Sequence, residues 1–228
     1  MPKIIIEPLL EQVEFDTVGL KFHSETNRAL KVWTNPEADV VTLNLFRSPP
    51  DISVSLSNLE GLRNIYREQV TGAKGGLIEV SMLEISDVPS IKTIFKLPQK
   101  IAGVAYVASI TIPFKDFSFV LKITCQERGF GGTRETRILE QRRLALLERG
   151  KTQDALESWN SDPYDSSFQS ELLMTFAENE IFDSDFPDHP VSRARFWIRK
   201  FAESVKLDKT LLKFESLEKR KKKLFGLF

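Results

Sequence analysis

The stretch FDSDFPDHP carries four groups that could hold a cation. Asp183, Asp185, Asp188 and His189 offer carboxylate oxygens and an imidazole nitrogen, the donors that hard and borderline divalent ions accept. A metal ion held there would activate water, so these residues predict a metal-assisted hydrolase. The sequence favours a structural role over a metal site: Asp188 or His189 caps a helix that begins at Pro190, where a missing N–H costs nothing.

A second candidate is the glycine-rich stretch CQERGFGGTRE. Arg128, Gly131, Gly132 and Arg134 could hold an anion at the start of the helix that follows. The spacing does not match a dinucleotide fingerprint, because the third glycine directly follows the second, and no Lys-Ser or Lys-Thr pair completes a phosphate loop. The sequence therefore favours a plain strand-to-helix turn, with the anion site as the alternative.

The segment ESWNSDPYDSSF mixes aromatic and acidic side chains. It lies in an acidic region, residues 154–192, which contains ten Asp or Glu and no Lys or Arg. Such a surface suits a protein partner, in particular a basic one. It does not suit nucleic acid, because the acids repel its phosphates. The residues expected to bind the partner are Trp159, Asp162, Tyr164, Asp165 and Phe168.

The C-terminal region has the opposite charge. Residues 193–228 hold twelve Lys or Arg and four acids, so we expect basic helices to fold back on the acidic region. The end of the chain could instead contact an anionic membrane surface, dock on a partner or fray. The residues of this basic and apolar tail are Lys219, Arg220, Lys221, Lys222, Lys223, Leu224 and Phe225.

Composition sets the broad class. The chain has 228 residues, 41% of them hydrophobic, which is enough for one large domain or one domain with a helical appendix. Lys and Arg together number 32, as do Asp and Glu, which argues against a globally basic nucleic-acid binder. A single cysteine fits a reducing compartment, and no apolar run is long enough for a signal peptide or a membrane span. We therefore expect a cytoplasmic protein.

Catalytic motifs are not recognisable in this sequence. The two histidines, His23 and His189, lie far apart, and neither G-x-S-x-G nor H-E-x-x-H occurs. Cys125 shares the apolar face of an alternating segment and is expected to be a small buried hydrophobe. We therefore assign no catalytic residue and no cofactor.

The spacing of apolar residues predicts an α+β fold. From about residue 19 to 126 apolar and polar residues alternate, as in Val41–Leu45, Ile78–Met82, Val104–Ile112 and Phe117–Cys125. One apolar and one mixed face indicate an antiparallel sheet of about six to seven strands, covered mainly on one side. One helix interrupts the strands, with Ser57 and Glu60 as its capping box.

Helical spacing begins after residue 133. We expect helices at Arg134–Glu148, Ser167–Glu178, Pro190–Val205 and Asp208–Lys223, so the C-terminal part should be mostly helical. The domain prediction is a sheet domain at residues 1–150 and a helical extension at 151–228, which packs on the sheet or forms a small subdomain.

This order of elements resembles the PsbP-like α+β fold. The likeness rests on Leu59–Val70, on Gly75-Gly-Leu-Ile-Glu-Val80 and on Gly103-Val-Ala-Tyr106, and it covers about residues 20–130. The resemblance implies an antiparallel sheet with helices packed on it. The family includes chaperones for type VI secretion effectors, and its members are often non-enzymatic binding proteins, which implies binding rather than catalysis.

Three functions follow from these patterns. The leading hypothesis is a non-enzymatic, cytoplasmic protein-binding module that escorts another protein, as a secretion-effector chaperone does, or neutralises a toxin, as an immunity protein does. The first alternative is the metal-assisted hydrolase built on Asp183, Asp185, Asp188 and His189. The second is a peripheral membrane protein that uses residues 219–228.

Overall fold

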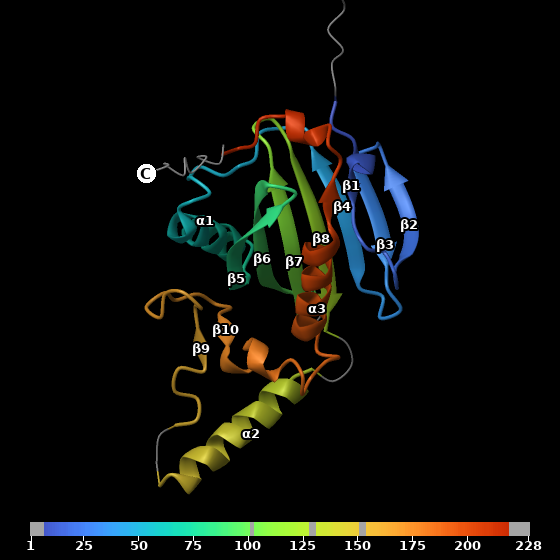
Figure 1. Ribbon diagram of the computed structural model, residues 1–228. Coiled ribbons are helices and arrows are strands. Elements are labelled where there is room, and N and C mark those ends of the chain that lie inside the picture. The colour runs from blue at the N-terminus through green and yellow to red at the C-terminus, as the bar shows by residue number, and fades with distance from the viewer. Residues whose placement is uncertain (1–6, 101–102, 128–130, 151–153, 219–228) are drawn as a thin grey trace, which may run out of the picture.

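The computed structural model describes residues 7–100, 103–127, 131–150 and 154–218. Its centre is a seven-stranded, wholly antiparallel sheet in the order β2-β3-β4-β8-β7-β6-β5 (Figure 1). The strands are β2 (Lys21–Thr26), β3 (Leu30–Thr34), β4 (Val40–Phe46), β5 (Gly76–Ile85), β6 (Val88–Pro98), β7 (Val104–Pro113) and β8 (Ser118–Gln126). The predicted antiparallel sheet within an α+β fold is confirmed.

Alternation along the strands separates the two faces of the sheet. Leu43 of β4 lies opposite Leu121 of β8 on the apolar face, whereas the next pair, Thr42 and Lys122, lies on the other face. Cys125 is fully buried on the apolar face, as its place in the alternation predicted.

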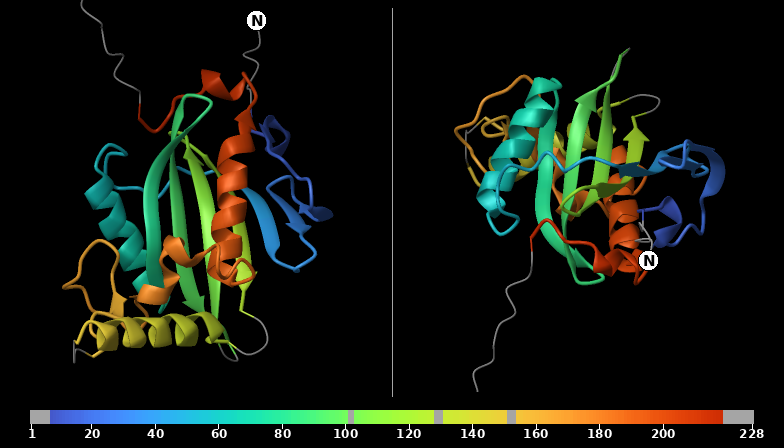
Figure 2. Two further views of the ribbon diagram at one scale, coloured as in Figure 1. Left: turned by 60° about the horizontal axis from the view of Figure 1, so that its bottom comes forward. Right: turned by 90° about the horizontal axis from the view of Figure 1, so that it is seen from above.

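Helices α1 (Leu59–Gly72) and α3 (Pro190–Ser204) pack on opposite faces of the sheet (Figure 2). The prediction of a sheet covered mainly on one side was therefore wrong. Helix α3 buries Ile198 and Phe201 in the main core, which also contains Ile94 of β6. Helix α1 instead packs on Ile91 of the same strand. Ile91 is an odd number of residues away from Ile94, so its side chain lies on the other face of the sheet. Each large apolar side chain that is fully buried in this way stabilises the fold by about 1.5–3 kcal/mol.

Asn58, and not Ser57, caps α1. The Asn58 side chain accepts a hydrogen bond from the N–H of Gly61 at 2.9 Å, while the Ser57 hydroxyl lies 2.6 Å from that of Ser55. The predicted capping box was therefore wrong by one residue, because Asn is at least as good a cap as Ser.

Helix α2 (Thr133–Glu148) crosses beneath the lower ends of the strands (Figure 2). Its first half is anchored by the buried residues Arg134 and Ile138, and its second half carries the exposed Leu144 and Leu147. The residue before the helix is Gly132, whose φ of 80° is a left-handed conformation that glycine adopts without strain.

The C-terminal part is not mostly helical, which corrects the prediction. Of the expected helices beyond residue 150, α3 alone forms in the described residues, and His189 caps it as one alternative predicted. In place of the helix at Ser167–Glu178, β10 (Met174–Thr175) pairs with β9 (Asn160–Ser161) and is followed by a 3-10 turn, Phe176–Glu178. Tertiary pairing overrides local helix spacing here.

The expected helix at 208–223 is likewise replaced, as far as residue 218, by a 3-10 turn, Leu211–Lys213. Leu211 is fully buried, and the chain then runs extended, with Ser216 bridged to Phe114. Two further short elements, β1 (Val13–Glu14) and β11 (Lys206–Leu207), pair with each other after another 3-10 turn, Leu10–Gln12. The main core thus contains residues from both sides of the expected boundary at residue 150.

Candidate functional site

Charged residues gather at one end of the sheet, where β6 and β8 end and β7, α2 and α3 begin. We call this region the base of the sheet. Many of its charged side chains belong to the acidic region and face cations on the strands and helices, as in Asp183–Arg195 and Glu180–Arg199. The expected folding of basic helix residues onto the acidic region is therefore seen at α3.

Both carboxylate oxygens of Glu178 accept hydrogen bonds at the base. Its side chain is almost fully buried, and Lys96 Nζ donates to its two oxygens at 3.1 and 2.9 Å. The Tyr106 hydroxyl and the Thr175 N–H each donate to it at 2.5 Å. Burial and the Glu178 charge raise the pKa of Tyr106, so this hydroxyl keeps its proton and remains a donor.

Arg134 is committed to the fold. Its side chain is fully buried and donates to the carbonyls of Ala177 and Asn179, to Ser192 and to Asp183. These bonds tie α2 to the 3-10 turns and to α3. Four of the five N–H donors of the guanidinium are consequently used within the chain, although the sequence pattern predicted an anion-binding role for it.

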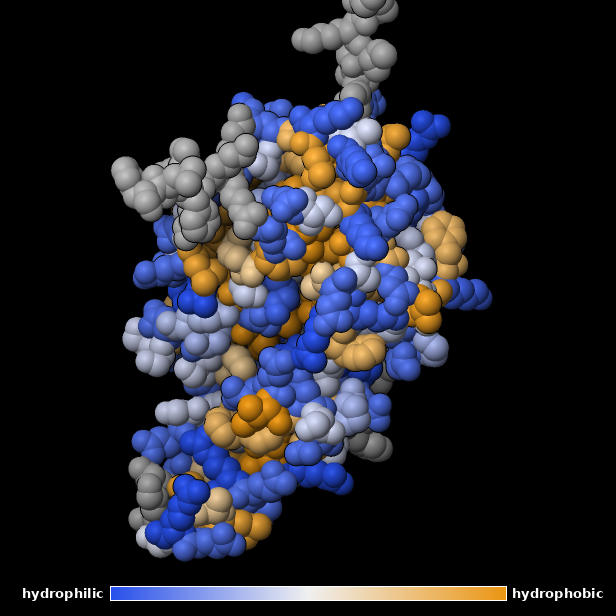
Figure 3. All heavy atoms as spheres, in the orientation of Figure 1, coloured by the Kyte–Doolittle hydropathy of each residue, from blue (hydrophilic) through white to orange (hydrophobic). Residues whose placement is uncertain are grey.

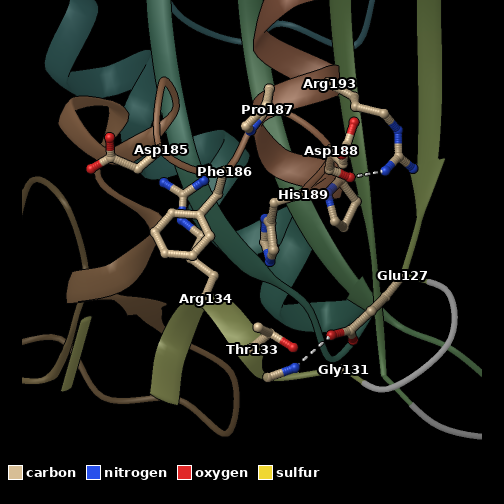
Figure 4. Close-up of a pocket in the computed structure, with 12 residues that line it drawn as sticks. Glu127, Gly131, Thr133, Arg134, Asp185, Phe186, Pro187, Asp188, His189 and Arg193 are labelled. Atoms are coloured by element: carbon tan, nitrogen blue, oxygen red, sulfur yellow. Dashed lines mark hydrogen bonds between the residues drawn. The ribbon is translucent and has the colours of Figure 1, made fainter. Parts of the chain in front are cut away.

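The glycine-rich loop encloses a carboxylate of the chain itself. Glu127 accepts a hydrogen bond from the N–H of Gly132 at 3.2 Å (Figure 4). It accepts another from the N–H of Val104, also at 3.2 Å. A Cβ at Gly131 would lie 2.3 Å from one Glu127 oxygen, and a Cβ at Gly103 would lie 2.5 Å from the other. The glycines therefore make room for Glu127, which lies where an anion would bind at the start of α2.

The side chains of the four proposed metal ligands do not converge on one point, although three of these residues line one hollow. The Asp183 carboxylate accepts from Arg134, Arg195 and Ser192, while Asp185 is exposed and points away from His189 (Figure 4). His189 uses Nδ1 to cap α3. Within the described ranges no group of three or more His, Cys, Asp or Glu side chains could hold a metal ion.

Two hollows share the wall formed by Glu127, Gly131 and Gly132. The His189 hollow, of about 350 Å³, brings predicted anion and metal residues together; it is lined by Gly131, Gly132, Arg134, Asp185, Asp188, His189 and their neighbours (Figure 4). The Tyr106 hollow, of about 500 Å³, is lined by Lys96, Gly103, Val104, Tyr106, Glu127, Gly131, Gly132, Glu135, Leu172, Thr175 and Glu178.

Glu135 lines the Tyr106 hollow and contacts His189, which lines the other hollow, and its two carboxylate oxygens differ. Oε1 lies 3.5 Å from Nε2 of His189, whereas Oε2 is buried without a hydrogen-bond partner among the described residues. Burial alone would raise the pKa of Glu135, but the hydrogen bond with His189, its own backbone N–H and the charges of His189 and Arg134 together lower it. The carboxylate is therefore ionised at neutral pH.

The acidic and aromatic residues expected to bind a partner are largely turned inward. Trp159 and Asp162 are buried, and Asp162 forms a two-bond ion pair with Arg67 of α1, at 2.9 and 2.8 Å. The Tyr164 hydroxyl bonds to the backbone of Val80 in β5. Asp165 and Phe168 are partly buried beside them. A partner-binding role for these residues remains a prediction.

Several sequence predictions fall outside the described residues. These are the anion-site residue Arg128 and the tail residues Lys219, Arg220, Lys221, Lys222, Lys223, Leu224 and Phe225. In the part of the chain that is described, no helix has both the length and the apolar character needed to cross a membrane.

Sequence reasoning did not single out Lys96, Glu127 or Glu178 as site residues. A signal for Lys96 was available: it lies two residues after Ile94 and hence on the same inward face of β6. A lysine at an inward position needs a buried acid, but the sequence does not say which of the ten acids supplies it.

No family model matches the chain, and no curated protein matches it. The solved structures that it resembles include PsbP of the cyanobacterium Synechocystis, with 11% identity over 56% of this chain and 85% of that chain and a TM-score of 0.35. A weak PsbP-like resemblance, without a close family, is what the sequence predicted.

Two further structures show the same degree of likeness. A Pseudomonas aeruginosa protein of unknown function has 7% identity over 59% of this chain and 95% of that chain, with a TM-score of 0.35. A Bacteroides thetaiotaomicron protein has 6% identity over 54% of this chain and only 41% of that chain, with a TM-score of 0.34. Similarity at this level carries no argument about function.

Proposed function

We propose that the protein is a non-enzymatic binding module that accepts an extended segment of another protein at the outer edge of β2. One observation carries the proposal: β2 pairs with β3 alone among the described strands, and five of its six residues are exposed. An open edge of this type offers unpaired backbone donors and acceptors to an incoming strand.

Apolar side chains beside this edge support the proposal. Val18, just before β2, and Phe22, within it, are 75% and 53% exposed, and we call them the β2 apolar surface. Apolar groups reach the surface on this side of the molecule in Figure 3. Phe22 packs edge-on against the buried Trp33, with ring centroids 5.8 Å apart, so it is held in place before any partner arrives.

The edge also selects against indiscriminate pairing. A bulge interrupts the β2–β3 register between Phe22 and Ser24, and Lys21 and Glu25 flank it. Bulges and charges are the devices by which exposed edges avoid unspecific strand addition. A partner strand must therefore tolerate the bulge and offer groups compatible with both charges, which favours a dedicated partner.

Such an edge would serve both classes of protein that the sequence suggested: an escort for a secreted protein and a toxin-neutralising protein. The commitment of the charged base to internal bonds also favours binding over hydrolysis, because Asp183, Glu178 and Arg134 already stabilise the fold. A peripheral membrane role through residues 219–228 stays a prediction of the sequence.

Photo-crosslinking tests this proposal. p-Benzoylphenylalanine is placed at position 22 in β2 or, as a matched control, at the exposed position 84 in β5, and the cells that make the protein are irradiated. We expect one defined partner from position 22 and not from position 84. With the purified partner, Phe22→Ser should weaken binding by about tenfold or more.

Hydrogen exchange of the reconstituted complex locates the contact. The β2 amides should become protected on binding, while the amides of β5 keep their exchange rates. A complex that protects another surface and leaves β2 unchanged would overturn the proposal, as would crosslinking of the same protein from both positions.

A further inference from the structure

Helix α3 holds the segment of the chain that leads into β2. Lys200 Nζ donates to the carbonyl of Val18 at 2.7 Å and lies 3.2 Å from Oδ2 of Asp16. The other carboxylate oxygen of Asp16 accepts from the N–H of Val18 at 2.8 Å. The backbone of Val18 is therefore bonded at both of its polar groups, by an aspartate turn and by a lysine of α3.

Two further contacts set this segment against α3. The N–H of Asp16 donates to Oγ of Ser204 at 3.1 Å, one helical turn after Lys200. Gly19 has a φ of 86°, which glycine adopts without strain, and a Cβ there would lie 3.5 Å from the indole ring of Trp197. The Lys200 ammonium lies 4.8 Å from the centre of the same ring. One face of α3 thus holds the chain from Asp16 to Gly19.

Val18 is half of the β2 apolar surface, so the contacts that hold Val18 bear on the binding proposed for this edge. A side chain whose position is set before a partner arrives loses less conformational entropy on binding. We infer that Lys200 is a positioning residue for the β2 edge, which acts by holding Val18 where an incoming segment would meet it. This inference rests on the proposed function, and it assigns control of the edge to α3.

The contribution of Lys200 to folding should be small. Its side chain is 24% exposed, and an ion pair that is open to solvent adds little to the free energy of unfolding. Lys200→Met keeps an apolar stem beside Trp197 and removes the ammonium. The variant should therefore unfold at nearly the denaturant concentration of the wild type, while its Val18 is released.

Backbone ¹⁵N relaxation in the free protein tests the hold on Val18. The heteronuclear NOE of the Val18 and Gly19 amides should fall in Lys200→Met. It should keep its wild-type value in Lys200→Arg, which retains the charge and the donors. Lys209→Met, at an exposed lysine beyond α3, is the matched control and should change neither amide. Wild-type NOE values in Lys200→Met would overturn the inference.

Affinity for the partner that is crosslinked from position 22 tests the consequence for binding. Lys200→Met should weaken binding by about threefold to tenfold, and Lys200→Arg should bind as the wild type does. In a Val18→Ala background Lys200→Met should have a clearly smaller effect, because most of the side chain that Lys200 positions is gone. Equal fold-changes in the two backgrounds would show that Lys200 does not act through Val18, and would overturn the inference.

The inference and the proposed function fail in different ways. If Phe22→Ser weakens binding of the partner while Lys200→Met binds it as the wild type does, the positioning role is wrong and the β2 edge remains the binding site. If no partner is crosslinked from position 22, the proposed function is wrong, and the inference falls with it.

Discussion

One edge of the sheet is covered by another segment of the chain, and the other edge is open. At the β5 edge, the Tyr164 hydroxyl accepts from the N–H of Val80 at 2.9 Å and donates to its carbonyl at 3.3 Å. The Arg63 guanidinium lies 3.8 Å above the Tyr164 ring, and the Arg67–Asp162 pair ties the same segment to α1. At the β2 edge, no described residue plays an equivalent part.

This difference separates stability from recognition. An edge strand is a liability unless it is short, charged, bulged or covered. The ten-residue β5 is covered by a segment of the chain, whereas the six-residue β2 relies on its bulge and on Lys21 and Glu25. We infer that changes at the β5 edge affect folding, while changes at the β2 edge affect binding.

The largest effect is expected at the covered edge for Asp162→Ala. The Asp162 side chain is 1% exposed, and its loss leaves the Arg67 guanidinium buried without its carboxylate partner. The free energy of unfolding, measured by chemical denaturation, should fall by about 3–5 kcal/mol.

Asp165→Ala, in the same segment, is the matched control, because Asp165 bonds to the nearby Ser167 and not to Arg67. Its effect should be far smaller. A loss below about 1 kcal/mol for Asp162→Ala would show that this pair behaves like a surface ion pair and that the cover is loosely held.

The same segment shows what the sequence could and could not predict. The alternation of apolar residues in β4, β7 and β8 comes from local spacing, and it led to the correct sheet. Trp159, Asp162 and Tyr164 looked like a partner surface because they are aromatic and acidic. The inward orientation of Asp162 and Tyr164 depends on Arg67 and Val80, which are more than 80 positions away in the chain.

The sequence singled out several residues that the fold places at the base of the sheet, but not the hydrogen bonds that they form. Gly131, Arg134 and His189 were singled out, and all of them line the His189 hollow. The occupant of the glycine loop, Glu127, was not foreseen, although the quoted stretch CQERGFGGTRE contains it. Local sequence can identify a helix start, but which carboxylate approaches it is decided by tertiary structure.

An intermediate effect is expected at alkaline pH from Tyr66, on the helix that packs beside the covered edge. Burial raises the pKa of Tyr66 to about 12, and its hydrogen bond with Thr111 opposes this shift in part. The folded state thus keeps a proton that the unfolded chain, with a pKa of 10.0, has lost. The contribution of Tyr66 to the free energy of unfolding is fully present below pH 10. It is lost as the pH rises through 12, by about 2–3 kcal/mol in total.

Tyr66→Phe isolates this contribution. The free energy of unfolding of the wild type should decrease more steeply above about pH 10 than that of the variant. The buried Tyr106 is present in both proteins, so its titration cancels in the comparison. Parallel curves for the two proteins would mean that the Tyr66 hydroxyl is open to solvent and that α1 covers this side less tightly.

The smallest and most local effect is expected for Tyr164→Phe, which removes one oxygen and keeps the ring under Arg63. The N–H and carbonyl of Val80, a fully buried residue, then lose their partner, at a cost of about 1–2 kcal/mol. Native-state hydrogen exchange should show the Val80 amide accelerated in the variant, with the β2 amides, already unpaired on their outer side, unaffected. Equal rates at Val80 in the two proteins would mean that the β5 edge is covered by the bulk of the segment and not by this hydroxyl, and the contrast between the two edges would then rest on packing alone.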